Sequence, residues 1–222
     1  MPQGEEKLAV EVAPGKAITA IRTPAAGAPR GWCFVYAPGA GSNVHDPFGA
    51  FICRALTDEG VEAVRFQFPY MEARRRSPDR TSVLEATWRA VIEHVRSPRT
   101  RLAVGGRSMG GRIASHVVAQ GVPVEALALF AYPLHSPARP EQWRDEHLPQ
   151  IAVPTLFCSG TRDAFASPEE LREAASRMAH ATVHSLDGAD HGFSPSKASG
   201  RTRQEVWEEA HATFRDWLDA IR

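Results

Sequence analysis

The amino-acid sequence predicts an α/β fold in which helices cover both faces of a mostly parallel central sheet. Short apolar segments alternate along the chain with segments of helical periodicity, which is typical of strands joined by helices. Several of these segments are apolar at nearly every position, as expected for strands buried on both faces. Because 222 residues can bury one sizeable hydrophobic core, we expect a single domain over residues 1–222.

Eight strands are expected. The first two, 8–12 and 17–22, flank a turn at Pro14–Gly15 and form an opening pair. Six further apolar segments follow at 32–37, 61–66, 101–104, 127–131, 155–158 and 182–186.

Helices are expected where apolar residues recur three and four positions apart. One such pattern runs over 48–56, with Gly60 as its stop, and a second runs over 83–95. Ser167 opens a third helix with a Ser-Pro-Glu-Glu capping box, and the last helix covers 206–221. Sheets of this kind bind ligands beyond the carboxyl ends of their strands, so the chemistry is expected there.

The composition excludes several classes of protein. Twenty-six basic residues balance 26 acidic ones, so no overall field favours nucleic acid or an anionic membrane. No run of about 18 apolar residues is present, and the opening residues lack a basic segment followed by an apolar one, so we expect neither a membrane span nor a secretory signal. Cys33, Cys53 and Cys158 are expected to be buried thiols in a reducing compartment, and their spacing fits no zinc site. We therefore expect a cytoplasmic protein that contains no metal.

The most informative segment is Gly106-Arg-Ser-Met-Gly110, a G-x-S-x-G motif. An apolar strand precedes it and a helical pattern follows, so the chain must turn sharply and expose the Ser108 hydroxyl at the apex. We expect a strained backbone there, and a helix N-terminus aimed at developing negative charge. Because the motif arises by chance in about one chain in ten of this length, the strand–turn–helix context is what favours a nucleophile.

A serine nucleophile needs a base, and the base needs an acid that orients it. His191 is the preferred base because its glycine-flanked loop follows a strand, and Asp163 is the preferred acid because it too follows a strand. Asp190, which adjoins His191, and Asp187 are weaker alternatives. The order Ser108, Asp163, His191 is that of α/β-hydrolases. The other histidines lie in helical patterns (His94, His116, His180, His211), in a strand (His184), in a polar loop (His147) or after strand ends (His45, His135).

Two backbone N–H groups are expected to form an oxyanion hole. One belongs to Met109, directly after the nucleophile. The other belongs to Ala40, in the glycine-rich loop after the strand at 32–37. The same loop could cradle a phosphate, but it lacks the Lys-Ser/Thr ending of a P-loop.

Five motifs occur in a distinctive order along the chain: PGAGS (38–42), RFQFPYMEARRRSPDR (65–80), GGRSMGG (105–111), SGTRDAF (159–165) and GADHGF (188–193). Together they resemble those of small α/β-hydrolases without a cap domain that are related to dienelactone hydrolases. The resemblance spans nearly the whole chain and implies hydrolase chemistry without naming a substrate. Dienelactone hydrolases use a cysteine nucleophile where this sequence has Ser108, and some animal relatives of the group have scaffolding roles.

The substrate-binding residues are less strongly indicated. The run Arg74–Arg76 is either a solvated loop or a site of attraction for an anionic substrate or partner. Near it, the side chains of Phe68, Tyr70 and Met71 are expected to line a pocket. Further candidates for substrate contact are Gly39, Trp143 and Phe165.

The sequence thus predicts a carboxylic ester hydrolase that forms an acyl-enzyme and needs no cofactor. Only about 20 residues, near 135–151, are available for a lid, so the site should be open to small or polar esters. The same triad could act on a thioester, lactone or peptide, and a non-catalytic binding or scaffold protein is the alternative of another class. The oligomeric state is left open.

Overall fold

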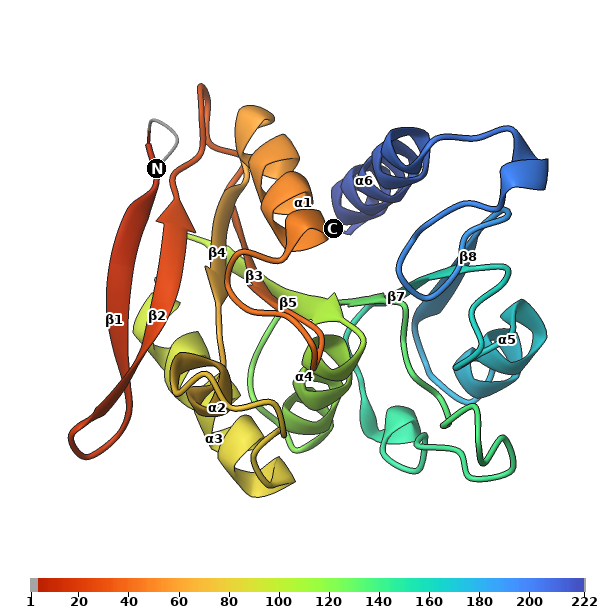
Figure 1. Ribbon diagram of the computed structural model, residues 1–222. Helices are drawn as coiled ribbons and strands as arrows, with labels where there is room; N and C mark the ends of the chain where they lie inside the picture. The colour runs from red at the N-terminus through yellow and green to blue at the C-terminus, as the bar shows by residue number, and fades with distance from the viewer. Residues whose placement is uncertain (1–3, 222) are drawn as a thin grey trace.

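The computed structural model describes residues 4–221, so the predicted domain, 1–222, extends beyond the described residues at both ends. Its eight strands form one sheet of order β1-β2-β4-β3-β5-β6-β7-β8 (Figure 1). β2 pairs antiparallel with β1 and with β4, and all other neighbours are parallel, which confirms the predicted fold class. The strands are β1 Glu6–Ala13, β2 Lys16–Thr23, β3 Trp32–Ala37, β4 Glu62–Phe66, β5 Arg101–Arg107, β6 Ala126–Phe130, β7 Thr155–Gly160 and β8 Ala181–Leu186.

The largest error at a single predicted strand end is at β5, which was expected to end at Val104 and continues to Arg107. Gly105 and Gly106 hide this continuation, because glycine has a low strand propensity. The structure requires glycine there nonetheless. A Cβ on Gly105 would lie 1.9 Å from the Ala128 carbonyl oxygen on the neighbouring strand.

Helices cover both faces of the sheet, as predicted. The apolar sides of α1 and α6 pack on one face, and those of α3, α4 and α5 pack on the other (Figure 1). Gly60 lies past the end of α1 at φ +88°, and Ser167 forms the expected capping box with Glu170. The helices are α1 Pro47–Asp58, α2 Pro69–Glu72, α3 Thr81–Val95, α4 Met109–Ala119, α5 Pro168–Ala175 and α6 Arg203–Ala220, with 3₁₀ turns η1 Leu148–Gln150 and η2 Lys197–Ser199.

Two local features differ from the sequence analysis. The helix α2 was not predicted, because four residues are too few to show helical periodicity. His180, which was assigned to a helical pattern, lies in the turn between α5 and β8. That prediction was wrong because α5 ends at Ala175 and residues 176–180 form turns and a bend.

No lid domain is inserted between β6 and β7, as expected from the sequence. This connection, residues 131–154, is described throughout, and η1 is its one helical element. The carboxyl end of the sheet therefore lacks a helical cover at the position where lids of such folds are usually inserted.

The three cysteines are buried and none is in a disulfide among residues 4–221. Burial raises the pKa of the Cys53 thiol to about 12 and raises those of Cys33 and Cys158 further, so all three stay protonated at neutral pH. In the part of the chain that the structure describes, no helix is long and apolar enough to cross a membrane.

The Gly106→Ala variant is expected to lose about 3 kcal/mol or more of folding stability. Gly106 has φ +152°, and an added Cβ would lie 2.1 Å from the backbone oxygen of Ala37, which cannot move without breaking β3–β5 pairing. Urea denaturation followed by circular dichroism measures the loss. The matched control is Gly41→Ala, because no atom lies within 4 Å of the position a Cβ would take there. Equal stabilities of the two variants would contradict the close approach.

Candidate active site

Ser108 forms the turn between β5 and α4 by itself, since β5 ends at Arg107 and α4 begins at Met109. Its backbone has φ +52° and ψ −122°, a conformation that residues other than glycine rarely adopt. The Ser108 N–H donates to the Phe130 carbonyl at 2.8 Å, which ties the turn to the end of β6. The sharp, strained turn expected from the motif is present.

The loop that follows β3 passes directly beside this turn. A Cβ on Gly110 would lie 2.2 Å from the Ala37 carbonyl oxygen, and one on Gly39 would lie 3.5 Å from the Ser108 Cβ. Glycine at position 110 thus allows the start of α4 to approach the loop. As a result, Gly39, a predicted substrate contact, lies against the serine.

The structure brings together the three side chains that the sequence analysis selected. The His191 Nε2 lies 2.9 Å from the Ser108 Oγ, although the two residues are 83 positions apart in the sequence. The His191 Nδ1 lies 2.9 and 2.8 Å from the two carboxylate oxygens of Asp163. One imidazole therefore bridges the serine hydroxyl and a carboxylate.

The environment of Asp163 differs from that of its rival, Asp190. The Asp163 side chain has no exposed surface, and its Oδ1 also accepts the Phe165 N–H at 2.8 Å. Asp190 instead accepts the N–H groups of Gly192 and Ser194, at 2.8 and 2.9 Å, and so stabilises the turn around His191. The two aspartates thus have separate roles, one on the imidazole and one on the backbone.

Phe165, a predicted substrate contact, lies against the imidazole itself. The ring centroids of Phe165 and His191 are 4.2 Å apart at an angle of 32°. The Phe165 backbone also fixes Asp163, so the one residue contacts both members of the pair. The predicted pocket residue Trp143 lies elsewhere, packed on the core and near the Arg177 guanidinium.

The two other histidines that follow strand ends, His45 and His135, form no hydrogen bond or ion pair with Ser108. His135 is buried, and its Nε2 lies 3.2 Å from the Glu170 carboxylate of the α5 capping box. The His45 N–H donates to the Asn43 side chain at 2.8 Å.

The two predicted oxyanion donors flank the serine. Met109 is the first residue of α4, where a backbone N–H has no partner within the helix. Ala40 follows Gly39, and its carbonyl accepts the Tyr70 hydroxyl at 2.8 Å. Burial raises the pKa of Tyr70 to about 12, so this hydroxyl is a neutral donor at neutral pH. In the described residues, 4–221, neither N–H has a hydrogen-bond partner.

A buried carboxylate that the sequence analysis missed fixes the same loop. Asp46 accepts the Tyr36 hydroxyl at 2.7 Å and the Ser42 hydroxyl at 3.1 Å, and caps α1 through the Gly49 N–H at 2.9 Å. The Arg107 guanidinium, next to the serine, lies 3.1 Å from it. Asp46-Pro47 is an N-cap followed by proline, which was a signal for the cap but not for the longer-range contacts.

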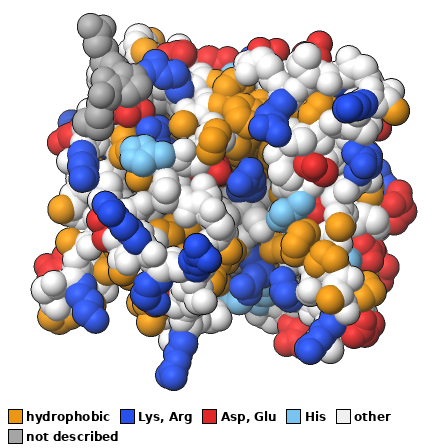
Figure 2. Space-filling model, viewed as in Figure 1, with side chains coloured by type: hydrophobic (Ala, Val, Ile, Leu, Met, Phe, Trp, Pro, Cys, Tyr) orange, Lys and Arg blue, Asp and Glu red, His pale blue; other side chains and the backbone are white. Residues whose placement is uncertain are grey.

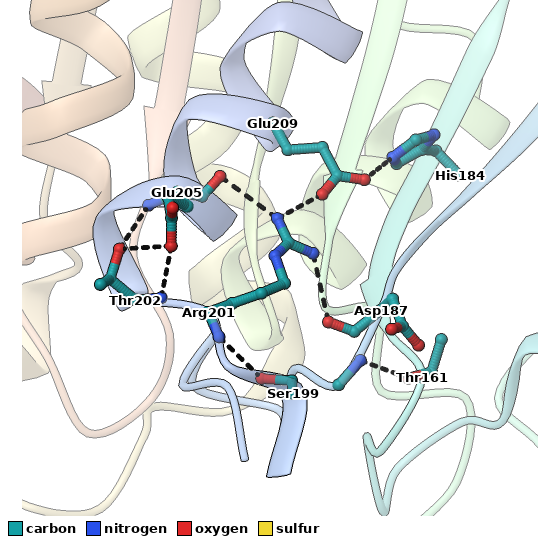
Figure 3. Close-up of polar contacts among 9 residues, drawn as sticks. Thr161, His184, Asp187, Ser199, Arg201, Thr202, Glu205 and Glu209 are labelled. Carbon is teal, nitrogen blue, oxygen red and sulfur yellow. Dashed lines mark hydrogen bonds and ion pairs between the residues drawn. The ribbon is translucent and has the colours of Figure 1, made fainter. Parts of the chain in front are cut away.

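A second missed network anchors the loop that carries His191 (Figure 3). The Gly188 N–H donates to the Thr161 hydroxyl at 2.8 Å, at the end of β7. The Arg201 guanidinium donates to the Asp187 carbonyl at 3.2 Å and to the Glu209 carboxylate at 2.5 Å. The loop is therefore held at its start and again against α6.

Three of the remaining predicted substrate contacts line one cavity, whereas Phe68, which was also expected to line the pocket, is fully buried in the hydrophobic core. The volume of the cavity is about 320 Å³, and Tyr70, Met71 and Arg74 line it together with Ala40. Arg74 holds φ +54°, and Arg75 pairs with Asp79. The arginine run thus faces the loop that carries a predicted oxyanion donor.

The chain matches a known protein family over most of its length. A model of the alpha/beta hydrolase domain matches residues 30–219. The chain belongs to the α/β-hydrolase family. Because this match covers most of the chain, the α/β-hydrolase fold extends from β3 through most of α6.

Solved structures of α/β-hydrolases superpose on nearly the whole chain. An alpha-beta serine hydrolase homologue from Coxiella burnetii is 21% identical, with a TM-score of 0.74 over 94% of this chain and 96% of that one. A serine hydrolase without a lid from Xanthomonas campestris is 19% identical, with a TM-score of 0.74 over 98% and 96%. A dienelactone hydrolase from Anabaena variabilis is 17% identical, with a TM-score of 0.71 over 96% and 99%. These likenesses support the fold, including its lack of a lid, and the family resemblance is confirmed.

Proposed function

We propose that this α/β-hydrolase is a serine hydrolase that cleaves small or polar carboxylic esters through an acyl-enzyme. The observation that carries the proposal is the His191 imidazole, which lies 2.9 Å from the Ser108 Oγ and 2.8 Å from the Asp163 carboxylate. Such an arrangement activates a serine hydroxyl, whereas a binding protein has no need of it.

In the proposed mechanism, the Ser108 Oγ attacks the ester carbonyl while the His191 Nε2 takes its proton. The Asp163 carboxylate accepts the Nδ1–H, which leaves Nε2 free to accept and stabilises the imidazolium. His191 then returns the proton to the leaving alcohol, and the acyl-enzyme forms on Ser108. A water molecule, deprotonated by the same imidazole, releases the acid. General base catalysis of this kind contributes about 10²- to 10⁴-fold.

The N–H groups of Met109 and Ala40 are proposed to stabilise the oxyanion of each tetrahedral intermediate. Each such donor contributes about 3 kcal/mol. The Tyr70 hydroxyl holds the Ala40 carbonyl, and Asp46 holds the rest of the loop through Ser42. The second donor is therefore fixed in place before substrate binds.

An open site favours small or polar esters, because no lid supplies an apolar cover for a long acyl chain. The cavity of about 320 Å³ beside Ala40 has room for a short acyl or alcohol group. The cytoplasmic location expected from the cysteines stays a prediction.

A fluorophosphonate probe is expected to label the purified protein at one site, Ser108, because the probe reacts with activated serines. Mass spectrometry of the peptide that contains residues 101–112 locates the adduct. A panel of short acyl esters, thioesters, lactones and peptides, assayed in parallel, is expected to show the fastest turnover with esters. Faster thioester, lactone or peptide turnover would reassign the substrate class. Absence of both labelling and turnover would favour a scaffold protein.

A further inference from the structure

One side of α4 connects the serine to a second group of polar residues. Ser108, Arg112 and His116 are partly exposed, whereas the residues between them, 109–111 and 113–115, are buried. Positions four apart lie on the same side of a helix, so the three form one open row that begins at the proposed nucleophile. The Arg112 N–H donates to the Ser108 carbonyl at 3.0 Å, as the helix requires.

The Arg112 guanidinium has no carboxylate partner among residues 4–221. Its one recorded side-chain contact is the His116 Nε2, 3.4 Å from its NH1. Burial lowers the pKa of Arg112 and is the largest cause of its shift; Arg144 acts in the same direction, and Tyr132 and Glu85 act in the opposite one. A guanidinium stays charged in proteins even so, and a partly buried charge without a counter-ion costs free energy. An anion at this position would offset that cost.

Arg144 extends the positive charge across the neighbouring segment. Two hydrogen bonds fix its backbone: the Arg144 N–H donates to the Leu134 carbonyl at 2.7 Å, and the Arg144 carbonyl accepts the Tyr132 hydroxyl at 2.8 Å. Its side chain is exposed and forms no salt bridge with any described residue. The segment that carries Arg144 packs against α4, since the His147 Nε2 lies 2.7 Å from the Ser115 Oγ, and neither guanidinium forms a salt bridge among residues 4–221.

The acidic residues of this region are already engaged. Glu85 lies 3.0 Å from the His116 Nδ1, and the buried Asp145 pairs with Arg177. Burial lowers the pKa of both His116 and His147, so at neutral pH the imidazoles add no positive charge. Because the His116 imidazole is neutral, Glu85 keeps its charge, and the two guanidinium groups together with this one carboxylate leave an excess of positive charge here. Figure 2 shows Lys and Arg side chains around the lower half of the hollow in the middle of this face.

We propose that Arg112 and Arg144 form a subsite for an anionic group, a carboxylate or a phosphate, at the remote end of the substrate. This inference rests on the proposed hydrolase function and names the class of ester. Four residues of helix separate Ser108 from Arg112, an axial distance of about 6 Å. A group bound there is thus a few bonds from the carbonyl under attack, as in the half-ester of a five-carbon dicarboxylic acid. Guanidinium groups bind the paired oxygens of carboxylate and phosphate in the same way.

The test compares two esters of equal chain length, the mono-4-nitrophenyl ester of glutaric acid and 4-nitrophenyl valerate. Their ratio of kcat/KM, glutarate over valerate, is expected to fall about tenfold in the Arg112→Met variant, since a charge-assisted hydrogen bond is lost. Arg144→Met, at an exposed position, should lower the ratio severalfold and keeps the test valid if Arg112→Met does not fold. The matched control is Arg99→Met, which removes an exposed arginine before β5, at the opposite end of that strand from Ser108, and should keep the wild-type ratio.

Calorimetric titration of the Ser108→Ala protein with glutarate, and separately with inorganic phosphate, measures the subsite without turnover and shows which anion it prefers. Binding of either anion that Arg112→Met weakens about tenfold supports the subsite. If all variants hydrolyse the two esters with the same ratio of kcat/KM and no anion binds, the subsite is overturned. The hydrolase proposal would then remain intact. Arg112-dependent binding in a protein that hydrolyses neither ester would overturn the hydrolase proposal and leave the subsite.

Discussion

Replacing Ser108 with alanine is expected to lower kcat for ester hydrolysis about 10⁴- to 10⁶-fold. The change removes the only atom within hydrogen-bond distance of the His191 Nε2 in the described structure, and with it the covalent route. The fold should survive, because the turn is held by the Ser108 backbone N–H and not by its hydroxyl. Initial rates with a 4-nitrophenyl ester measure the loss, and thermal unfolding followed by circular dichroism verifies the fold.

Ser176→Ala is the matched control for this variant. Ser176 is exposed at the end of α5, where its hydroxyl donates to the Glu173 carbonyl at 2.7 Å. The rate of ester hydrolysis by Ser176→Ala should equal that of the wild type. A folded Ser108→Ala protein with more than about one hundredth of the wild-type rate would place the nucleophile elsewhere, since a lost triad serine leaves far less.

Asp163→Asn is expected to lower kcat about 10⁴-fold, the scale seen when a triad aspartate becomes an asparagine. The side-chain oxygen of the asparagine would still accept the Phe165 N–H, so the NH₂ group of the same amide would face the His191 Nδ1. The imidazole would then carry its proton on Nε2, where it can no longer accept the serine proton. Steady-state kinetics with one activated ester measures the effect at a fixed pH.

Asp190→Asn provides the comparison that separates the two aspartates. Asparagine keeps a side-chain oxygen that can accept the N–H groups of Gly192 and Ser194, so kcat should fall less than about tenfold. If Asp190→Asn lost more activity than Asp163→Asn, the acid would be assigned wrongly.

The fold was predictable because its signals are local. Apolar segments, the glycines around Ser108 and the Ser167 capping box each act within a few residues. The choice of Asp163 over Asp190 was also open to local reasoning, since a residue next to His191 in the chain rarely orients its side chain. Whether these residues act in catalysis is for the variants above to decide.

The supports of the site were not predictable, because they join distant parts of the chain. The contact between Tyr70 and the Ala40 carbonyl spans 30 residues, and the contact between Arg201 and the Asp187 carbonyl spans 14. An aspartate before a proline, as at Asp46, indicates a helix cap, but nothing near it in the sequence indicates its contact with Arg107. Arg112 likewise became informative once the structure showed that no carboxylate among residues 4–221 pairs with it.

The order of the strands has a consequence for how the protein folds. Ser108 follows β5 in the middle of the sheet, whereas Asp163 and His191 follow β7 and β8 at its far edge. The contact between Ser108 and His191 closes a loop of 83 residues, and such distant contacts form late because chain closure must precede them. In a chain whose β7 and β8 are undocked, Ser108 would lack both the proposed base and the proposed acid. Under the proposed mechanism, the Ser108 hydroxyl is therefore activated only after β7 and β8 have docked.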